Sequence, residues 1–259
     1  MEVIIRSDKE SATALAANII ADYVKRKPTL ILGLATGRTM EELYDKLAIM
    51  NLDFTFCKSF NLDEYLGIEP ANKNSYRYYM NKHLFEKINI NIKNTYLPDG
   101  TVKNTVKSCK EYENLIIDNG GIDLQLLGIG RSGHIGFNEP LSALRSRTRE
   151  KALTPTTVAQ NSPLFDNPED MPKRALTMGV GTILEAKRII MLVTGREKAD
   201  ILAKAVEGPI TSMISATALQ LHPTCTVIVD EDAAEKLQER EYYRWIFENE
   251  PEWEPYRVV

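Results

Sequence analysis

The feature of this sequence that most limits its fold is a strand–loop–helix unit that recurs along the chain. Residues 29–34 form a short, continuous apolar run, which is typical of a parallel strand covered on both faces. A small loop at 35–39 leads into an amphipathic helix predicted over 40–48. The pattern predicts further strands at 54–62, 122–128, 189–193 and 227–230, and helices at 7–27 and 196–207. This alternation predicts an α/β fold with a doubly wound, mostly parallel, Rossmann-like sheet flanked by helices.

The length of the chain bounds its domain organisation. Its 259 residues can bury one substantial core, and no Pro-, Gly- or Ser-rich linker divides them. We therefore predict a single domain over residues 1–259, with a C-terminal tail from about residue 239. The Tyr, Trp and Glu residues of that tail indicate a terminal helix that packs on a neighbouring subunit.

Charge, hydropathy and cysteine usage exclude several classes of partner. A formal net charge of −4 argues against general affinity for nucleic acid. No apolar run approaches the roughly 18 residues that span a bilayer, and the charged first residues resemble a strand, not a signal peptide. The three scattered cysteines predict neither a zinc site nor a disulfide framework. We predict a cytoplasmic protein with no metal, nucleic-acid or membrane partner.

The loops that follow the predicted strands are the candidate functional regions, because ligands of such sheets bind outside the carboxyl ends of the strands. The loop after residues 29–34 supplies two hydroxyls, a glycine and a cation: Thr36, Gly37, Arg38 and Thr39. Unpaired N–H groups at a helix N-terminus favour phosphate binding, although Thr39 could simply cap the helix. Lys198, early in the helix after 189–193, could reach a phosphate at the same edge or be solvated.

Two carboxylates, Asp63 and Glu64, follow the strand predicted at 54–62. In extended structure they point to opposite sides, so only one would face a substrate. A solvated turn is the alternative. A basic run further along has two interpretations, a solvated face or a second anion site: Arg145, Arg147, Arg149 and Lys151.

His134 lies among four glycines in the loop that follows the strand at 122–128. If this flexible loop folds back, Glu139 can hold the imidazole in one tautomer, as acid–base chemistry near neutral pH requires. A structural histidine is the alternative. His222 and His83 read as structural and packing residues.

Four strings carry a resemblance to a known family: residues 61–65 (Asn-Leu-Asp-Glu-Tyr), 133–140 (Gly-His-Ile-Gly-Phe-Asn-Glu-Pro), 146–149 (Ser-Arg-Thr-Arg) and 175–184. From about Val3 to Asp230 the chain resembles the glucosamine-6-phosphate deaminases. The wider superfamily also contains 6-phosphogluconolactonases, but the first two strings favour the deaminase branch. The resemblance implies conversion of glucosamine 6-phosphate and water into fructose 6-phosphate and ammonia, without a cofactor, in amino-sugar catabolism.

The resemblance also implies roles for individual residues. His134 would open the sugar ring, Glu139 would orient it, and Asp63 would move the C2 proton to C1. Ser132 stands beside the histidine, where the family has Asp or Asn. Glu64 would be structural. The phosphate would be held by Thr36, Gly37, Arg38, Thr39 and Lys198.

Four departures from the family pattern bear on the site. Arg38 and Met40 interrupt a loop that usually reads Thr-Gly-Gly-Thr-Pro, Ser132 lacks a charge, and Leu141 replaces a common glycine. Pro163 aligns with a phosphate-binding arginine, whose loss should weaken binding roughly 10- to 150-fold. We hypothesise that Arg38 supplies the missing guanidinium; the rival idea is that it fills the pocket and changes the substrate.

Regulation and assembly follow from the resemblance as well. In regulated members of the family, N-acetylglucosamine 6-phosphate binds at a subunit interface, and Ser142, Arg149 and Lys151 match part of that allosteric site. Ala143 and Arg244 depart from it. Relatives range from monomer to hexamer, so a homo-oligomer is one option.

Two other functions stay open from sequence. One is a 6-phosphogluconolactonase-like hydrolase on the same fold, which would need a water-activating His134 but not Asp63. The other is a non-catalytic sugar-phosphate binder, which the altered phosphate loop and Pro163 make credible.

Overall fold

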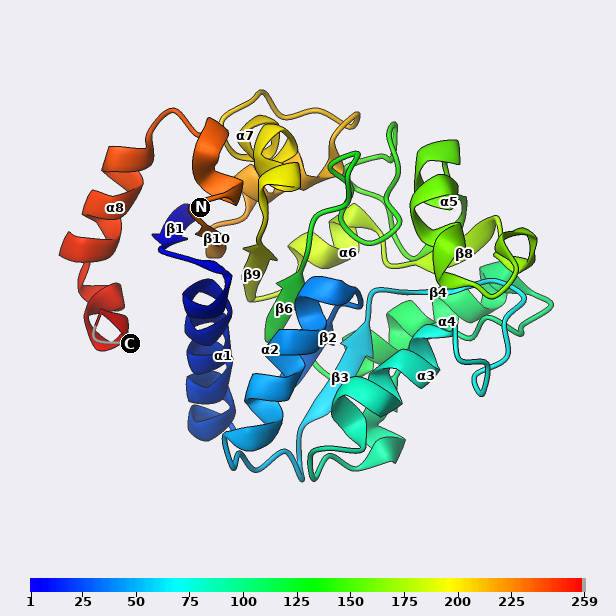
Figure 1. Ribbon diagram of the computed structural model, residues 1–259. Helices are drawn as coiled ribbons and strands as arrows, with labels where there is room; N and C mark the ends of the chain where they lie inside the picture. Colours follow the sequence, from blue (N-terminus) through cyan, green and yellow to red (C-terminus); the bar gives the residue numbers. More distant parts are fainter. Residues whose placement is uncertain (258–259) are drawn as a thin grey trace.

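The computed structural model describes residues 1–257, and a seven-stranded sheet lies at its centre (Figure 1). The strand order is β1-β10-β9-β6-β2-β3-β5, and every neighbouring pair is parallel. The strands are β1 (Glu2–Arg6), β2 (Ile31–Leu34), β3 (Lys58–Asn61), β5 (Thr95–Tyr96), β6 (Leu124–Leu127), β9 (Arg188–Val193) and β10 (Cys225–Asp230). This architecture confirms the doubly wound α/β fold.

Helices flank this sheet. The α-helices outside the tail are α1 (Lys9–Arg26), α2 (Arg38–Ile49), α3 (Tyr76–Met80), α4 (Thr105–Asp118), α5 (Pro155–Asn161), α6 (Val180–Leu184) and α7 (Ala199–Val206). A π-helix, η1 (Asn81–Phe85), extends α3. Short 3-10 turns are η2 (Ile92–Asn94), η3 (Ser162–Leu164), η4 (Pro168–Asp170), η5 (Arg196–Lys198), η6 (Ser215–Leu221) and η7 (Ala233–Lys236).

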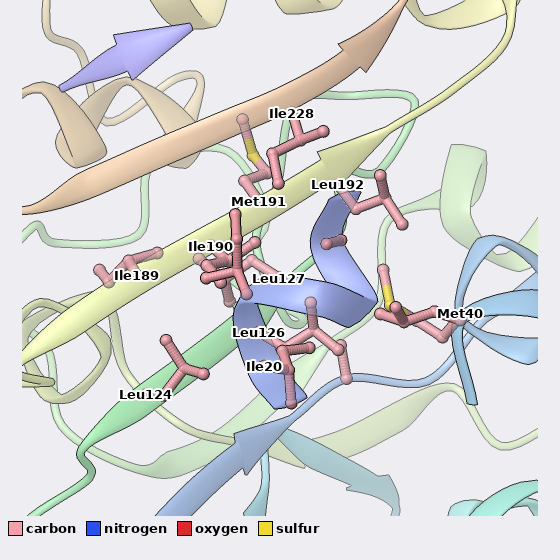
Figure 2. Packing of buried hydrophobic residues seen from close by; sticks show 14 of the residues in the cluster. Ile20, Met40, Leu124, Leu126, Leu127, Ile189, Ile190, Met191, Leu192 and Ile228 are labelled. Atoms are coloured by element: carbon pink, nitrogen blue, oxygen red, sulfur yellow. The ribbon is translucent and has the colours of Figure 1, made fainter. Parts of the chain in front are cut away.

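The central strands are apolar on both faces because helices cover them. Every residue of β6 is buried, as are the five residues 189–193 of β9. Figure 2 shows Ile20 of α1 and Met40 of α2 packed with the side chains of these strands. Burial on both sides explains why the sequence shows continuous apolar runs instead of alternation.

A second, three-stranded antiparallel sheet lies beside the first and was not predicted from the sequence. Its order is β4 (Asp63–Tyr65), β8 (Arg174–Thr177) and β7 (Arg149–Ala152). The strand expected over 54–62 is present but shorter than predicted: β3 covers only 58–61, and Asp63 begins a strand of a different sheet. Part of the basic run, residues 149–152, forms the partly exposed strand β7, and its two interpretations, a solvated face or a second anion site, stay open.

The C-terminal tail consists of α8 (Arg240–Asn249) and η8 (Pro251–Tyr256). It packs on its own chain, and the expected contact with a neighbouring subunit stays a prediction. Trp253 is fully buried, Arg6 lies over the Phe247 ring at 5.1 Å, and the Tyr256 hydroxyl donates to Asp22 at 2.8 Å. Within residues 1–257, none of the helices has both the length and the apolar character needed to cross a bilayer.

Candidate active site

Three loops meet at one edge of the central sheet. In the strand order, β6 lies between β9 and β2, whereas β3 lies on the other side of β2. The chain therefore changes direction across the sheet between β2 and β6, which is where open α/β sheets form ligand crevices. The loops after β2, β6 and β9 carry Arg38, His134 and Lys198, so the fold brings these three predicted site residues to the same edge.

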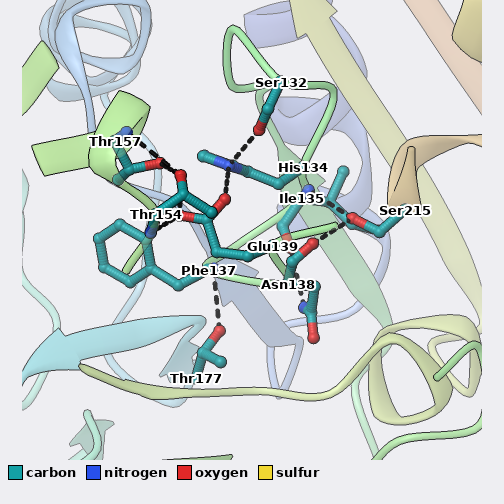
Figure 3. Close-up of polar contacts among 10 residues, drawn as sticks. All are labelled: Ser132, His134, Ile135, Phe137, Asn138, Glu139, Thr154, Thr157, Thr177 and Ser215. Atoms are coloured by element: carbon teal, nitrogen blue, oxygen red, sulfur yellow. Dashed lines mark hydrogen bonds and ion pairs between the residues drawn. The ribbon is translucent and has the colours of Figure 1, made fainter. Parts of the chain in front are cut away.

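His134 is fixed by two partners on its own loop (Figure 3). Its Nδ1 lies 2.9 Å from the Ser132 hydroxyl and 3.0 Å from Glu139 Oε2. The ring lies directly over Gly130, where a Cβ would come within 2.1 Å of His134 Nε2, so only glycine fits there. A carboxylate at Nδ1 favours the tautomer protonated on that nitrogen and leaves Nε2 for proton transfer.

Glu139 is itself held from the far side. Its Oε1 accepts from the backbone N–H and the hydroxyl of Thr154, both at 3.2 Å. The carboxyl group is almost fully buried. Burial raises its pKa, but the contact with His134 and the threonine partners outweigh burial and bring the pKa of Glu139 down to about 2. Glu139 is therefore an ionised anchor for the imidazole. Thr154 was missed from the sequence, since it lies 15 residues away with no motif around it.

Asp63 reaches the same loop from β4. A Cβ on Gly136 would lie 3.4 Å from Asp63 Oδ2, which places the carboxyl group beside the segment that follows His134. Burial, and secondarily the charge of Glu64, raise the pKa of Asp63 to about 8, against the opposing effect of the Phe137 backbone N–H. A buried carboxyl with a raised pKa near a histidine is typical of acid–base sites.

Glu64 points away from Asp63, as its place in a strand requires. Its carboxylate accepts from the backbone N–H groups of Tyr65 at 2.9 Å, Tyr76 at 2.9 Å and Arg77 at 3.0 Å. Glu64 thus binds the first turn of α3 to β4 and has no contact with the His134 loop among the hydrogen bonds of the described chain.

The loop after β2 ends at Gly37, whose φ of 123° is strained for any residue with a side chain. Helix α2 begins at Arg38 with no side chain capping it, so the alternative of a Thr39 cap was wrong. The Tyr79 hydroxyl donates to the Gly37 carbonyl at 2.8 Å, a support that the sequence gave no reason to expect.

Lys198 ends η5 and turns towards the loop after β6. Its Nζ donates to the Ile129 carbonyl at 2.8 Å. Burial lowers the pKa of Lys198, Glu197 opposes that shift, and the positive charges of Arg131 and Arg38 lower the pKa further. Lys198 therefore lies within electrostatic reach of both arginines. Arg131 was missed from the sequence, although it adjoins Ser132.

The structure shows the backbone setting of two departures from the family pattern, Pro163 and Leu141. Pro163 lies in η3, next to α5, where it offers no donor. Leu141 adopts a φ of 68° and is 74% exposed, which explains why a glycine suits this position.

Of the three residues predicted for the allosteric site, the side chain of Arg149 is hydrogen-bonded to the loop of His134. Arg149 Nη1 donates to Asn138 Oδ1 at 2.8 Å, which ties β7 to the loop of His134. The Ser142 hydroxyl and Arg149 Nη2 are buried without a hydrogen-bond partner in residues 1–257. Lys151 lies two positions further along β7, opposite Ala175, and no hydrogen bond joins it to Ser142 or Arg149 within the same residues.

The other histidines have the packing roles expected of them. His222 Nε2 lies 2.7 Å from the Ala186 carbonyl, and its Nδ1 accepts from the Thr224 N–H at 3.1 Å. His83 stacks on Tyr79 with the ring centroids 4.5 Å apart. Neither is hydrogen-bonded to the loop of His134 within residues 1–257.

An imidazole anchored by a carboxylate, with cations nearby at the switch point of a parallel sheet, defines an α/β enzyme that performs acid–base chemistry on a small anionic substrate. The chain belongs to the family described as glucosamine-6-phosphate isomerases/6-phosphogluconolactonase, whose sequence profile matches residues 7–228.

The relatives of this chain are similar along almost their whole length. A glucosamine-6-phosphate deaminase of Shewanella loihica is 47% identical over 250 residues, which cover 95% of this chain and 93% of the relative. One of Cellvibrio japonicus is 46% identical, with 95% of each chain covered. The solved structure of a monomeric glucosamine-6-phosphate deaminase is 41% identical, with a TM-score of 0.89 over 91% of this chain and 100% of that one. A 6-phosphogluconolactonase of Leishmania guyanensis shares the fold, at 18% identity, a TM-score of 0.73, and coverage of 92% and 98%.

Proposed function

We propose that this chain is an isomerising deaminase that converts glucosamine 6-phosphate and water into fructose 6-phosphate and ammonia. The observation that carries the proposal is the convergence of Asp63 and His134 on one loop: the imidazole lies on Gly130, and the carboxyl group adjoins Gly136. The chemistry needs a base beside C2 and a separate acid–base group at the ring oxygen. The deaminases at 41–47% identity support the same assignment.

His134 and Asp63 carry out different steps of the reaction. His134 Nε2 moves the proton that opens the ring and exposes the C1 aldehyde, while Glu139 stabilises the charged imidazole. Asp63 in its ionised form then takes the C2 proton. The electrons of that C–H bond form the C1–C2 double bond of an enolamine, and the C1 carbonyl oxygen takes a proton from water to become a hydroxyl. Asp63 returns a proton to C1, which leaves an imine at C2. Water adds to the imine carbon and ammonia departs, giving the ketose.

The phosphate end of the substrate belongs at the start of α2. Backbone N–H groups there and the charge of Lys198 favour a phosphate anion. The hydroxyls and cation of the loop complete the proposed phosphate site: Thr36, Gly37, Arg38, Thr39 and Lys198. A cytoplasmic setting suits the three cysteines, which are free and buried.

The test is the release of ammonia from purified enzyme. We expect ammonia and fructose 6-phosphate from glucosamine 6-phosphate, and no acid from 6-phosphogluconolactone. Hydrolysis of the lactone without ammonia release would contradict the proposal in favour of the lactonase. Binding of glucosamine 6-phosphate without turnover would contradict it in favour of the non-catalytic binder.

A further inference from the structure

Three cations gather at one end of the proposed site, and no ion pair within residues 1–257 joins them to an acidic side chain, although the charge of Glu197 acts on Lys198. Among residues 1–257, the side chains of Arg38 and Arg131 make no ion pair or hydrogen bond, and Lys198 bonds only a backbone carbonyl. The chain as a whole carries a net charge of −4, so acidic side chains are not scarce. Like charges that approach without a counter-charge cost free energy unless an anion joins them.

Arg131 occupies the tip of a tight turn. The Gly133 N–H donates to the Gly130 carbonyl at 3.0 Å, and the Gly130 N–H donates to the His134 carbonyl at 2.9 Å. Lys198 Nζ holds the preceding carbonyl, that of Ile129, at 2.8 Å. The backbone of Arg131 is therefore fixed between Lys198 and the ring of His134.

The first turn of α2 lies against the same loop. A Cβ on Gly128 would come within 3.3 Å of Met40 Cε. Met40 is in the first turn of α2, so Arg38, the first residue of that helix, starts beside this loop. The Lys198–Ile129 bond and the Met40–Gly128 contact bring the segments of the three cations to one loop, and the charges of both arginines act on Lys198.

We propose that Arg131 is a phosphate-binding residue, which contacts the phosphate of the sugar substrate together with Arg38 and Lys198. This inference rests on the proposed function and adds a specificity residue to it. Arg131 approaches from the turn that carries His134, whereas Arg38 approaches from α2. A phosphate dianion bound between them would be neutralised from two sides, so sugar phosphates would be preferred strongly over neutral sugars.

The test compares Arg131→Gln, Arg131→Lys and a matched control, Arg26→Gln. Arg26 is an exposed arginine at the end of α1, at the opposite edge of the sheet, and its loss changes the net charge equally. We would measure kcat and KM for glucosamine 6-phosphate and the inhibition constant of inorganic phosphate. We expect Arg131→Gln to raise both KM and the inhibition constant about 10-fold, with kcat changed less than about 2-fold. Arg131→Lys should recover part of the loss, and Arg26→Gln should match the wild type.

The other outcomes are equally decisive. An unchanged KM and phosphate inhibition constant in Arg131→Gln, with active wild type, overturns the inference and leaves the proposed function intact. A fall in kcat with unchanged phosphate inhibition also overturns it, because Arg131 would then act on the loop of His134. If the wild type releases no ammonia, the proposed function fails, and direct binding of inorganic phosphate to the same variants still decides the role of Arg131.

Discussion

Glu139 is held by Thr154 through the carboxylate oxygen that faces away from His134. Both the backbone N–H and the hydroxyl of Thr154 lie 3.2 Å from Oε1, while Oε2 lies 3.0 Å from the imidazole. Thr154 also precedes α5 and caps it, since its hydroxyl accepts from the Thr157 N–H at 3.3 Å. The start of α5 and the acid–base pair are thus parts of one hydrogen-bonded unit.

Thr154→Val should therefore slow the reaction and weaken the helix. The variant keeps the backbone donor but loses the hydroxyl, so we expect kcat to fall about 3- to 10-fold, the effect of one hydrogen bond. Loss of the cap should cost about 1 kcal/mol of unfolding free energy. Steady-state kinetics and urea denaturation measure the two effects. Thr154→Ser should restore both, and wild-type kinetics in Thr154→Val would show that Thr154 does not position Glu139.

Ser132→Asp tests the neutral side chain beside the histidine. Both Ser132 and Glu139 contact His134 Nδ1, so a second carboxylate there should stabilise the imidazolium. We expect the pH profile of kcat to move to higher pH and the rate near neutral pH to rise. The readout is kcat between pH 6 and pH 9, taken with Ser132→Asn as a neutral control. An unaltered rate and profile would refute the role assigned to Ser132.

Arg38→Gly tests the hypothesis that this arginine replaces a guanidinium lost at Pro163. Arg38 starts α2 and has no acidic partner within residues 1–257, which leaves it free to bind an anion. We expect KM for glucosamine 6-phosphate to rise roughly 10-fold or more, with a smaller effect on kcat. An unchanged KM rejects the hypothesis. A lower KM would favour the rival idea that Arg38 narrows the pocket.

The neighbouring carboxyls Asp63 and Glu64 should respond oppositely to amide substitution. In Glu64→Gln the amide nitrogen cannot accept a hydrogen bond, so a backbone N–H group of Tyr76 or Arg77 loses its acceptor. We expect a loss of about 1–3 kcal/mol in unfolding free energy.

Asp63 has a folded pKa of about 8, above an unfolded value of about 3.9. The Asp63 carboxyl therefore contributes a loss of stability that grows as pH rises from about 4 to 8, and Asp63→Asn lacks this contribution. Thermal unfolding across this range should show a growing advantage of Asp63→Asn, and a constant difference would contradict the raised pKa.

The sequence predicted the main sheet because its strands are buried on both faces and therefore read as continuous apolar runs. It also predicted that His134 and Glu139 pair, since glycines allow the loop to fold back. The antiparallel sheet was missed because β4 has three residues and β7 is largely charged, so neither shows an apolar pattern. Thr154 was missed because its contact with Glu139 spans 15 residues. The role proposed for Arg131 depends on the nearness of Arg38 and Lys198, which lie far from it in sequence, and no local pattern records that.

The burial of Asp63 beside the loop of His134 underlies the whole account, and proton transfer tests it most directly. Glucosamine 6-phosphate would be incubated in deuterated water with wild type or Asp63→Asn, and deuterium at C1 of the fructose 6-phosphate would be measured alongside ammonia. We expect the wild type to release ammonia and to place deuterium at C1 only in the turnovers in which the proton held by Asp63 exchanges with solvent. Ammonia release by Asp63→Asn should fall by a factor of about 100 or more, while fructose 6-phosphate still binds. Ammonia release by Asp63→Asn at the wild-type rate would contradict the assignment of Asp63 as the base.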